Sequence, residues 1–277
     1  MDGQAERAER FRALHERAGQ PLLMPNPWDV GSARLLESLG FEALATTSSG
    51  FAASLGRLDG GVTREQALAH GAQLAEAVGV PVSADLEHGF AHEPGDVAET
   101  VRLAGEAGLA GCSIEDYSGD RDDPIYPFEL AVERIAAAVE AAHAGGPARL
   151  VLTARAENHV RGRPDLVDTI ARLQAFEQAG ADVLFAPGLK SLDEIREVVA
   201  SVSRPVNVLV RGGSPTVAEL AEAGVRRISV GGGFAFAAYG TLADAARELR
   251  EQGTTSRYWE RTAAGVEAVR TAFGQSG

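Results

Sequence analysis

The stretch Val82-Ser-Ala-Asp-Leu-Glu-His-Gly89 is an apolar run that ends in two acids and a glycine. Residues i and i+2 of a β-strand point to the same face of a sheet. We therefore expect the carboxylates of Asp85 and Glu87 to project together from the end of one strand. Two further strand-like runs end in acids, at Ile114-Glu115-Asp116 and at Thr153-Ala-Arg155-Ala-Glu157. Carboxylates gathered at strand ends are oxygen ligands of the kind that a hard divalent cation such as Mg2+ requires.

The composition excludes several classes of partner. The 277 residues carry a formal net charge of −13, which argues against nucleic acid or an anionic membrane as a partner. No apolar run reaches the roughly 18 residues of a membrane span, and the polar N-terminus is not typical of a secretory signal. The single cysteine, Cys112, rules out an internal disulfide and fits a reducing compartment. We therefore expect a cytoplasmic protein with a small-molecule substrate.

A repeated order of helical segment, glycine, apolar strand and polar loop runs along the chain. The apolar runs are 21–25, 43–47, 81–85, 111–115, 150–155, 182–186, 205–209 and 227–231. Eight such β-then-α units predict an α/β fold, a TIM-type (β/α)8 barrel that forms a single domain over residues 1–277. The alternative is a doubly wound open sheet, which would require a glycine-rich dinucleotide turn after the first strand. The chain reads Pro25-Asn-Pro-Trp-Asp29 there.

Two helical stretches, 241–252 and 257–273, follow the last predicted strand, although the eighth unit needs only one helix. We therefore assign about 241–277 as a C-terminal helical extension. Its extra helix has an apolar face that must be buried. Packing on its own barrel and packing on a neighbouring subunit are both consistent with the pattern.

Active sites of (β/α)8 barrels lie at the C-terminal ends of the strands. The residues predicted there are polar and net acidic. They are Asn26, Trp28, Asp29, Thr46 to Gly50, Asp85, Glu87, Glu115, Asp116, Arg155, Glu157, Pro187, Asn207 and Gly231 to Gly233. Arg155 could hold a substrate carboxylate in a bidentate fork, or it could neutralise Glu157 or Asp85 as a structural ion pair.

Five short motifs, in order along consecutive strands, resemble the isocitrate lyase/phosphoenolpyruvate mutase superfamily. They are Thr47-Ser-Ser-Gly50, Asp59, Asp85-Leu-Glu87-His-Gly89, Ser113-Ile-Glu-Asp116 and Ala154-Arg-Ala-Glu157. Each motif alone is weak, but five in the right order form a specific pattern. The resemblance extends from about Phe11 to Tyr258.

The resemblance implies a (β/α)8 barrel whose last helix is exchanged between subunits, in a homo-oligomer such as a dimer or tetramer. It also implies Mg2+ or Mn2+ as cofactor and chemistry on C–C or P–C bonds of 2-oxo acids, through a metal-stabilised enolate. The implied metal ligands are Asp85, directly, Glu87 and Glu115, directly or through water, and Asp59 in the outer shell. The implied substrate-binding residues are Ser48, Ser49, Gly50, Asp85 and Arg155, and the candidate catalytic residues are Arg155, Glu115 and His88.

The loop after the fourth strand departs from the family. Isocitrate and methylisocitrate lyases carry a Lys-Lys-Cys-Gly-His-type loop there, and the phosphonate enzymes usually carry lysines. Here residues 117–126 contain no cysteine, lysine or histidine and are acidic, with Asp120, Asp122 and Asp123. These acids would repel a dianionic phosphonate. Because the loop also lacks the cysteine of the lyases, we do not expect isocitrate or methylisocitrate lyase activity.

The remaining residues predict a Mg2+-dependent lyase that acts on a small 2-oxo (di)carboxylic acid, by C–C cleavage or oxaloacetate-type decarboxylation. One alternative is a P–C bond enzyme like phosphoenolpyruvate mutase or phosphonopyruvate hydrolase. The other is a non-catalytic binding protein for a 2-oxo acid such as 2-oxoglutarate. A Schiff base on Lys190, the one lysine of the chain, is disfavoured because that lysine precedes a helix cap and is expected to be exposed.

Two further residues have open roles. His88 could be a general acid or a group behind the metal ligands. Asn207 is a polar residue inside an apolar strand, and substrate contact is slightly favoured over a hydrogen-bonded core amide.

Overall fold

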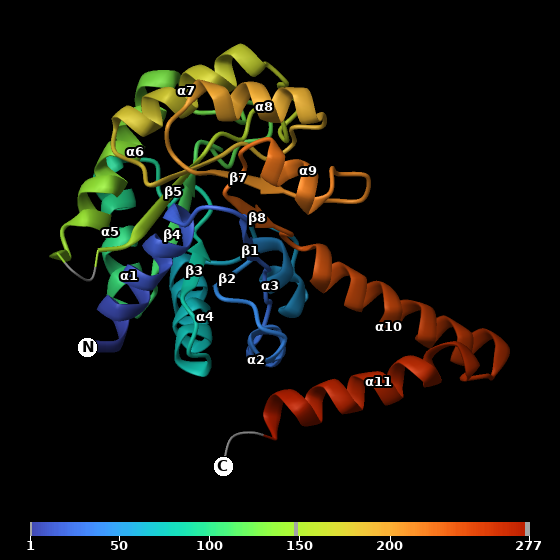
Figure 1. Ribbon diagram of the computed structural model, residues 1–277. Helices are drawn as coiled ribbons and strands as arrows, with labels where there is room; N and C mark the ends of the chain where they lie inside the picture. Colours follow the sequence, from blue (N-terminus) through green and yellow to red (C-terminus); the bar gives the residue numbers. More distant parts are fainter. Residues whose placement is uncertain (1, 147–148, 275–277) are drawn as a thin grey trace.

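In the computed structural model, which describes residues 2–146 and 149–274, eight parallel strands form one sheet with the order β1-β8-β7-β6-β5-β4-β3-β2 (Figure 1). Each predicted strand is present, and most are shorter than the apolar run that predicted them. The strands are β1 Leu22–Met24, β2 Leu44–Ala45, β3 Val82–Asp85, β4 Gly111–Glu115, β5 Val151–Arg155, β6 Val183–Phe185, β7 Val206–Leu209 and β8 Arg227–Ser229. The predicted (β/α)8 barrel is thereby confirmed.

Helices surround the strands, because parallel strands that are apolar on both faces must be covered. They are α1 Asp2–Glu16, α2 Val30–Ser38, α3 Ser48–Ser54, α4 Arg64–Ala77, α5 Pro94–Glu106, α6 Phe128–His143, α7 Leu166–Gln178, α8 Leu192–Ser201, α9 Val217–Glu222, α10 Gly233–Gln252 and α11 Ser256–Phe273. Capping boxes at Thr63 and Ser191 start α4 and α8. Among the described residues, no helix is both long enough and apolar enough to cross a membrane.

The barrel is closed between β1 and β2 by only a few bonds at its mouth. The Ala45 N–H donates to the Pro25 carbonyl (3.1 Å). The Asn26 side chain donates to the Thr46 carbonyl (3.0 Å) and accepts the N–H of Gly231 (2.8 Å). Asn26 therefore joins the ends of β1, β2 and β8, and its role in the structure is closure of the barrel.

Helix α1 closes the opposite end of the barrel. Its Phe11 is fully buried among residues from the starts of several strands. Its His15 lies in the same interior, where Nδ1 is 2.8 Å from the Phe11 carbonyl and Nε2 is 3.4 Å from Arg227 Nη1. A carbonyl can only accept, so Nδ1 carries the proton and Nε2 accepts from Arg227. Burial, and then the charge of Arg227, lowers the pKa of His15 to about 3.

The C-terminal extension differs from the prediction in its first helix. Helix α10 begins at Gly233 rather than near residue 241, and it runs continuously away from the barrel (Figure 1). Helix α11 then turns back, and its Phe273 lies beside Gly31 of α2. The large apolar side chains left exposed on these two helices are Phe234, Phe236, Leu242, Leu249, Trp259, Val266 and Val269. The single chain therefore buries only part of the apolar surface of its extension.

Gly111 is needed where β4 meets α1. A Cβ at this position would lie 2.6 Å from the Val151 carbonyl oxygen and 2.8 Å from the Phe11 ring. Gly111→Ala is expected to lower the free energy of unfolding by about 1–3 kcal/mol, because neither the strand nor the buried ring can move freely. Urea titration measures the change. The control is Gly105→Ala in α5, where the nearest atom is 3.9 Å away. There we expect no loss, and equal losses in both variants would contradict the packing argument.

The buried His15 predicts a loss of stability in acid. The unfolded chain takes up a proton near pH 6.5, whereas folded His15 resists protonation until about pH 3. Its contribution is therefore fully present above pH 6.5 and is lost as the pH falls towards 3. We expect His15→Gln, which keeps an acceptor for Arg227 but does not titrate, to reduce the decrease in unfolding free energy between pH 7.5 and 5 by about 2 kcal/mol.

Urea titrations at the two pH values measure this difference. The pKa values of His70 and His88 are also lowered by burial, and both residues contribute in the two proteins alike. Identical pH dependence of wild type and His15→Gln would show that His15 does not titrate as described.

Candidate functional site

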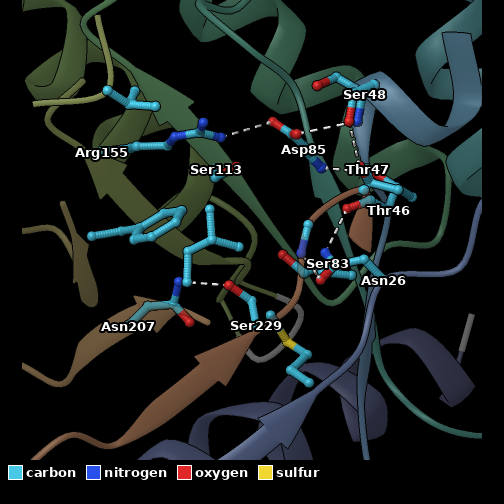
Figure 2. A pocket seen from close by; sticks show the side chains of 18 of the residues that line it. Asn26, Thr46, Thr47, Ser48, Ser83, Asp85, Ser113, Arg155, Asn207 and Ser229 are labelled. Atoms are coloured by element: carbon cyan, nitrogen blue, oxygen red, sulfur yellow. Dashed lines mark hydrogen bonds and ion pairs between the residues drawn. The ribbon is translucent and has the colours of Figure 1, made fainter. Parts of the chain in front are cut away.

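A cavity of about 210 Å³ extends from the C-terminal ends of the strands into the barrel. Figure 2 shows its wall, where side chains from several strands point towards one another. Of the residues predicted to bind metal or substrate or to act in catalysis, those that line it are Ser48, Ser49, Asp59, Asp85, Arg155 and Asn207. The other predicted strand-end residues that line it are Asn26, Thr46, Thr47, Glu157, Gly231 and Gly232. The structure therefore brings most of the predicted site together at the predicted end of the barrel.

Arg155, at the end of β5, lies among three carboxylates. Its Nε is 2.5 Å from Glu157, and its Nη1 is 3.2 Å from Glu115 and 3.6 Å from Asp85. Burial opposes its charge, but these acids raise the pKa of Arg155 above its ordinary value. The ion-pair alternative of the sequence analysis is thus present. Nη2 makes no hydrogen bond with the described part of the chain, so it remains available to a ligand.

Asp85 is held in a fixed orientation by backbone and side-chain groups. Its N–H donates to the Thr46 hydroxyl (2.8 Å), and its carboxylate accepts the N–H groups of Ser48 (3.2 Å) and Glu87 (3.3 Å). These bonds and the ion pair to Arg155 are visible in Figure 2, apart from the one from Glu87. Asp85 is therefore the best-positioned carboxylate in the cavity wall.

The prediction that Glu87 shares a strand face with Asp85 is wrong. Strand β3 ends at Asp85, and Glu87 has φ of 49°, so the alternation of an extended chain no longer applies. Glu87 does not line the main cavity but reaches a small adjoining pocket that Asp85 also lines. Burial, followed by the charges of Asp85 and Asp59, raises the pKa of Glu87 to about 8.

Glu115 is buried and lies behind Arg155 rather than in the cavity wall. Besides Arg155, it pairs with Arg161, whose Nη2 is 3.4 Å from the Glu115 carboxylate. The structure thus shows Glu115 as an ion-pair partner of two arginines. Its predicted roles as metal ligand and catalytic residue remain predictions.

The described acidic residues could hold a divalent cation through one or two carboxylates, but not through a cluster of three or more. Within the described residues, no group of three or more His, Cys, Asp or Glu side chains is placed to hold a metal ion together. A multi-carboxylate cage is therefore not the arrangement present. Mg2+, however, is commonly held by one or two carboxylates with water and substrate as the other ligands. A cation held directly by Asp85, with Glu87 and Asp59 reached through water, is compatible with this donor set.

The segment Ser48-Ser49-Gly50 forms the first turn of α3, capped by Thr47. The hydroxyls of Ser49 and Thr47 are 3.2 Å apart. Gly50 does not line the cavity, and its N–H is 3.4 Å from the Thr47 hydroxyl, so its predicted contact with substrate remains a prediction. A Cβ on Gly50 would lie 2.6 Å from Thr47 and 3.3 Å from Trp28. The glycine therefore permits close packing of α3, and only the two serines reach the cavity.

His88 does not line the main cavity, and its catalytic role remains a prediction. The turn through Glu87 and Phe90, both with positive φ, directs its ring towards a separate surface pocket. Burial, then the charges of Arg134 and His92, lowers the pKa of His88 to about 4.

Asn207 lines the cavity with both ends of its amide already engaged. Its nitrogen donates to the Ser229 hydroxyl (3.0 Å, Figure 2), and its oxygen accepts from Arg227 Nε (2.9 Å). This is the core-amide alternative, and substrate contact by Asn207 remains a prediction.

Two cavity arginines were missed by the sequence analysis. Arg161 donates to Glu157 (2.9 Å) and lies over the ring of Tyr117 (3.6 Å to the centroid). Its spacing of four from Glu157 was the available signal. Arg227 lies inside β8, where an arginine in an otherwise apolar strand was the only signal.

The chain is similar to known proteins over most of its length. Residues 11–250 match the family model of phosphoenolpyruvate phosphomutase. The chain is 31% identical over 234 residues to the oxaloacetate decarboxylase of Paraburkholderia xenovorans, a match that covers 82% of this chain and 75% of the relative.

Two solved structures are also similar. A protein of Burkholderia cenocepacia J2315, provisionally assigned as a lyase/mutase, is 55% identical with a TM-score of 0.90, and the match covers 93% of this chain and 92% of that chain. Oxaloacetate acetylhydrolase with its product oxalate is 26% identical with a TM-score of 0.84, covering 97% and 94%. The chain therefore belongs to the isocitrate lyase/phosphoenolpyruvate mutase superfamily.

Proposed function

We propose that the protein is a divalent-metal-dependent lyase that breaks a C–C bond of a small 2-oxo (di)carboxylic acid. The observation that carries the proposal is the pairing of Asp85 with Arg155 in one cavity wall, beside the hydroxyls of Ser48 and Ser49. A 2-oxo acid could be bound by these groups, because the guanidinium can bind its carboxylate and the Asp85 carboxylate can hold a cation beside its oxo group. Oxaloacetate is the first compound to test, since it occurs in the names of two relatives.

In this mechanism Arg155 binds the carboxylate next to the oxo group through its Nη2, and the serine hydroxyls orient the oxygens. A divalent cation on Asp85 would supply Lewis-acid polarisation of the oxo group when bound. In the decarboxylation of oxaloacetate, the bond between C3 and C4 breaks, C4 leaves as CO2, and the electron pair stays on C3. Water supplies the proton to C3, which completes pyruvate. The positive charge of Arg155 favours the enolate that forms on the way.

The loop after β4 supports C–C over P–C chemistry. Residues 117–126 contribute no side chain to the lining of the cavity in the described chain, and Asp120, Asp122 and Asp123 are exposed. No group from this loop is therefore placed to neutralise a phosphoryl group. Cleavage of a phosphonate and non-catalytic binding of a 2-oxo acid remain the alternatives.

A turnover panel tests the proposal. It offers oxaloacetate, 2-methylisocitrate, isocitrate, phosphonopyruvate and phosphoenolpyruvate, with Mg2+ or with EDTA, and identifies products by NMR. We expect metal-dependent cleavage of oxaloacetate above the free-metal background. Asp85→Asn should reduce it about 100-fold or more, because Lewis-acid stabilisation contributes several kcal/mol. The matched control is Asp193→Asn on α8, whose carboxylate is exposed.

Cleavage of phosphonopyruvate with oxaloacetate untouched would refute the proposal in favour of the P–C alternative. If none of the five compounds reacts while 2-oxo acids raise the melting temperature, the binding alternative is supported.

We also propose that the protein self-associates through α10 and α11, as a dimer or tetramer. The exposed apolar side chains of these helices, such as Leu242 (64% exposed) and Trp259 (66%), would be buried in such an interface. The double variant Leu242→Glu/Trp259→Glu is expected to be a monomer by light scattering, and wild type a larger species. Val167→Glu, at an apolar position on α7 that is even more exposed (79%), is the control and should remain associated. A monomeric wild type would contradict the proposal.

A further inference from the structure

Arg227 is a buried cation held only by neutral groups. Its side chain extends from β8 into the barrel and is 3% exposed. Its Nε donates to the Asn207 oxygen (2.9 Å), and its Nη1 donates to the Thr153 hydroxyl (3.0 Å) and to His15 Nε2 (3.4 Å). The neutral tautomer of His15 derived above is required for the last of these bonds. Three long-range acceptors therefore fix the guanidinium without neutralising it.

The charge of Arg227 has no counter-charge nearby. In the described part of the chain, no carboxylate oxygen lies within 4 Å of Arg227, whereas Arg155 has three carboxylates within that distance. A buried charge without a partner is costly. Burial accordingly lowers the pKa of Arg227 to about 9, which still leaves it charged at neutral pH. An anion next to this guanidinium would remove most of that cost.

The two N–H groups on Nη2 of Arg227 have no acceptor among the described residues. Arg227 lines the same cavity as Arg155 and Asp85, so these donors belong to a side chain that a ligand in the cavity can reach. The hydroxyls of Ser83, Ser113 and Ser229 line the cavity as well, and Figure 2 shows Ser83 and Ser229 below the pair of Asp85 and Arg155. The inner part of the cavity is therefore polar enough for a charged ligand.

The spacing along β5 relates the two arginines. Thr153, which holds Arg227, and Arg155 are two residues apart on one strand and point to the same face. The rise of a parallel strand places them about 6.6 Å apart along the barrel. One cationic group therefore lies at the mouth of the cavity and a second lies one layer of side chains deeper.

We propose that Arg227 binds a second carboxylate at the inner end of the cavity, so that the site selects short dicarboxylic acids that extend from Arg155 to Arg227. This inference rests on the proposed function and narrows its substrate class. A carboxylate held by Arg227 is retained, because its loss as CO2 would leave the buried guanidinium without a counter-charge again. Of the proposed C–C cleavages, the decarboxylation of oxaloacetate described above is then the less favoured, and cleavage between two parts that each keep a carboxylate is the more favoured.

The test measures binding of two unreactive four-carbon acids, succinate and butyrate, by calorimetry in chloride-free buffer with Mg2+. Wild type should bind succinate about 10- to 100-fold more tightly than butyrate, the range expected for one additional charged hydrogen-bonded contact. Arg227→Met should remove this preference and leave the affinity for butyrate within about twofold, since only the second carboxylate contacts the arginine.

The matched control is Arg226→Met. Arg226 is the preceding residue, is exposed, and lines a pocket at the opposite end of the barrel. It should keep the preference for succinate. The competing variant is Arg211→Met, because Arg211 lines the cavity near its outer rim. Loss of the preference in Arg211→Met but not in a folded Arg227→Met would overturn the proposal, as would a wild type that shows no preference.

If Arg227→Met fails to fold, Arg227→Lys, which keeps the charge but loses the planar fork, should show a reduced preference. An unchanged preference in the lysine variant would overturn the proposal, and so would equal rises in wild-type melting temperature with succinate and butyrate. The outcome is independent of turnover. A wild type that prefers succinate but cleaves none of the five acids refutes the proposed function alone, whereas turnover of oxaloacetate without any preference for succinate refutes this inference alone.

Discussion

Parallel strands that end at one edge of a barrel bring their terminal side chains together, and here three of those side chains are acids. Asp85 and Glu115 are the last residues of β3 and β4, Glu157 lies two residues after β5, and each lies within 3.6 Å of the Arg155 guanidinium. Without that cation, carboxylates in a largely buried wall would repel one another. Arg155 is thus a condition for the shape of the site as well as a candidate ligand for substrate. Removing it would expose the acids to one another before any effect on chemistry could be seen.

Two arginines in the cavity, Arg155 and Arg227, differ in the charge of the groups that surround them. Arg155 is surrounded by carboxylates, so the field that it presents to a ligand is reduced. Arg227 has only an amide, a hydroxyl and an imidazole as partners, and its full charge acts on whatever enters the inner cavity. The barrel supports both arrangements with the same strands, which illustrates that the fold supplies positions and the individual side chains decide the chemistry.

Most of the fold could be predicted from the sequence because it depends on local periodicity. Each strand is an apolar run, and helix starts such as Thr63 and Ser191 carry their own capping residues. The positions of site residues were predicted correctly where those residues belong to a strand. Asp85 and Arg155 occupy strand ends and lie where alternation placed them.

The sequence did not predict the position of a side chain where the chain leaves a strand, or where contacts with residues distant in the sequence determine that position. Glu87 and His88 lie in a turn in which Glu87 and Phe90 have positive φ, and no sequence pattern predicted this turn. The close packing of Gly50 against Trp28 and Ala235 was not predicted either, because Ala235 comes from a distant part of the chain. Arg227 escaped notice because its partners are neutral and come from α1, β5 and β7.

The pairing of β1 with β8 makes the site a late product of synthesis. Strand β1 has no ladder partner until β8 has been made, and Asn26 cannot complete the mouth without the backbone at Gly231. Helix α1 and Arg227, at the two ends of the chain, meet in the floor of the cavity. A ribosome-bound chain that ends before β8 therefore has an open sheet edge and lacks Arg227 and Ser229 of the cavity wall. Until β8 is made, the edge of β1 is the part of the chain most exposed to association with other chains.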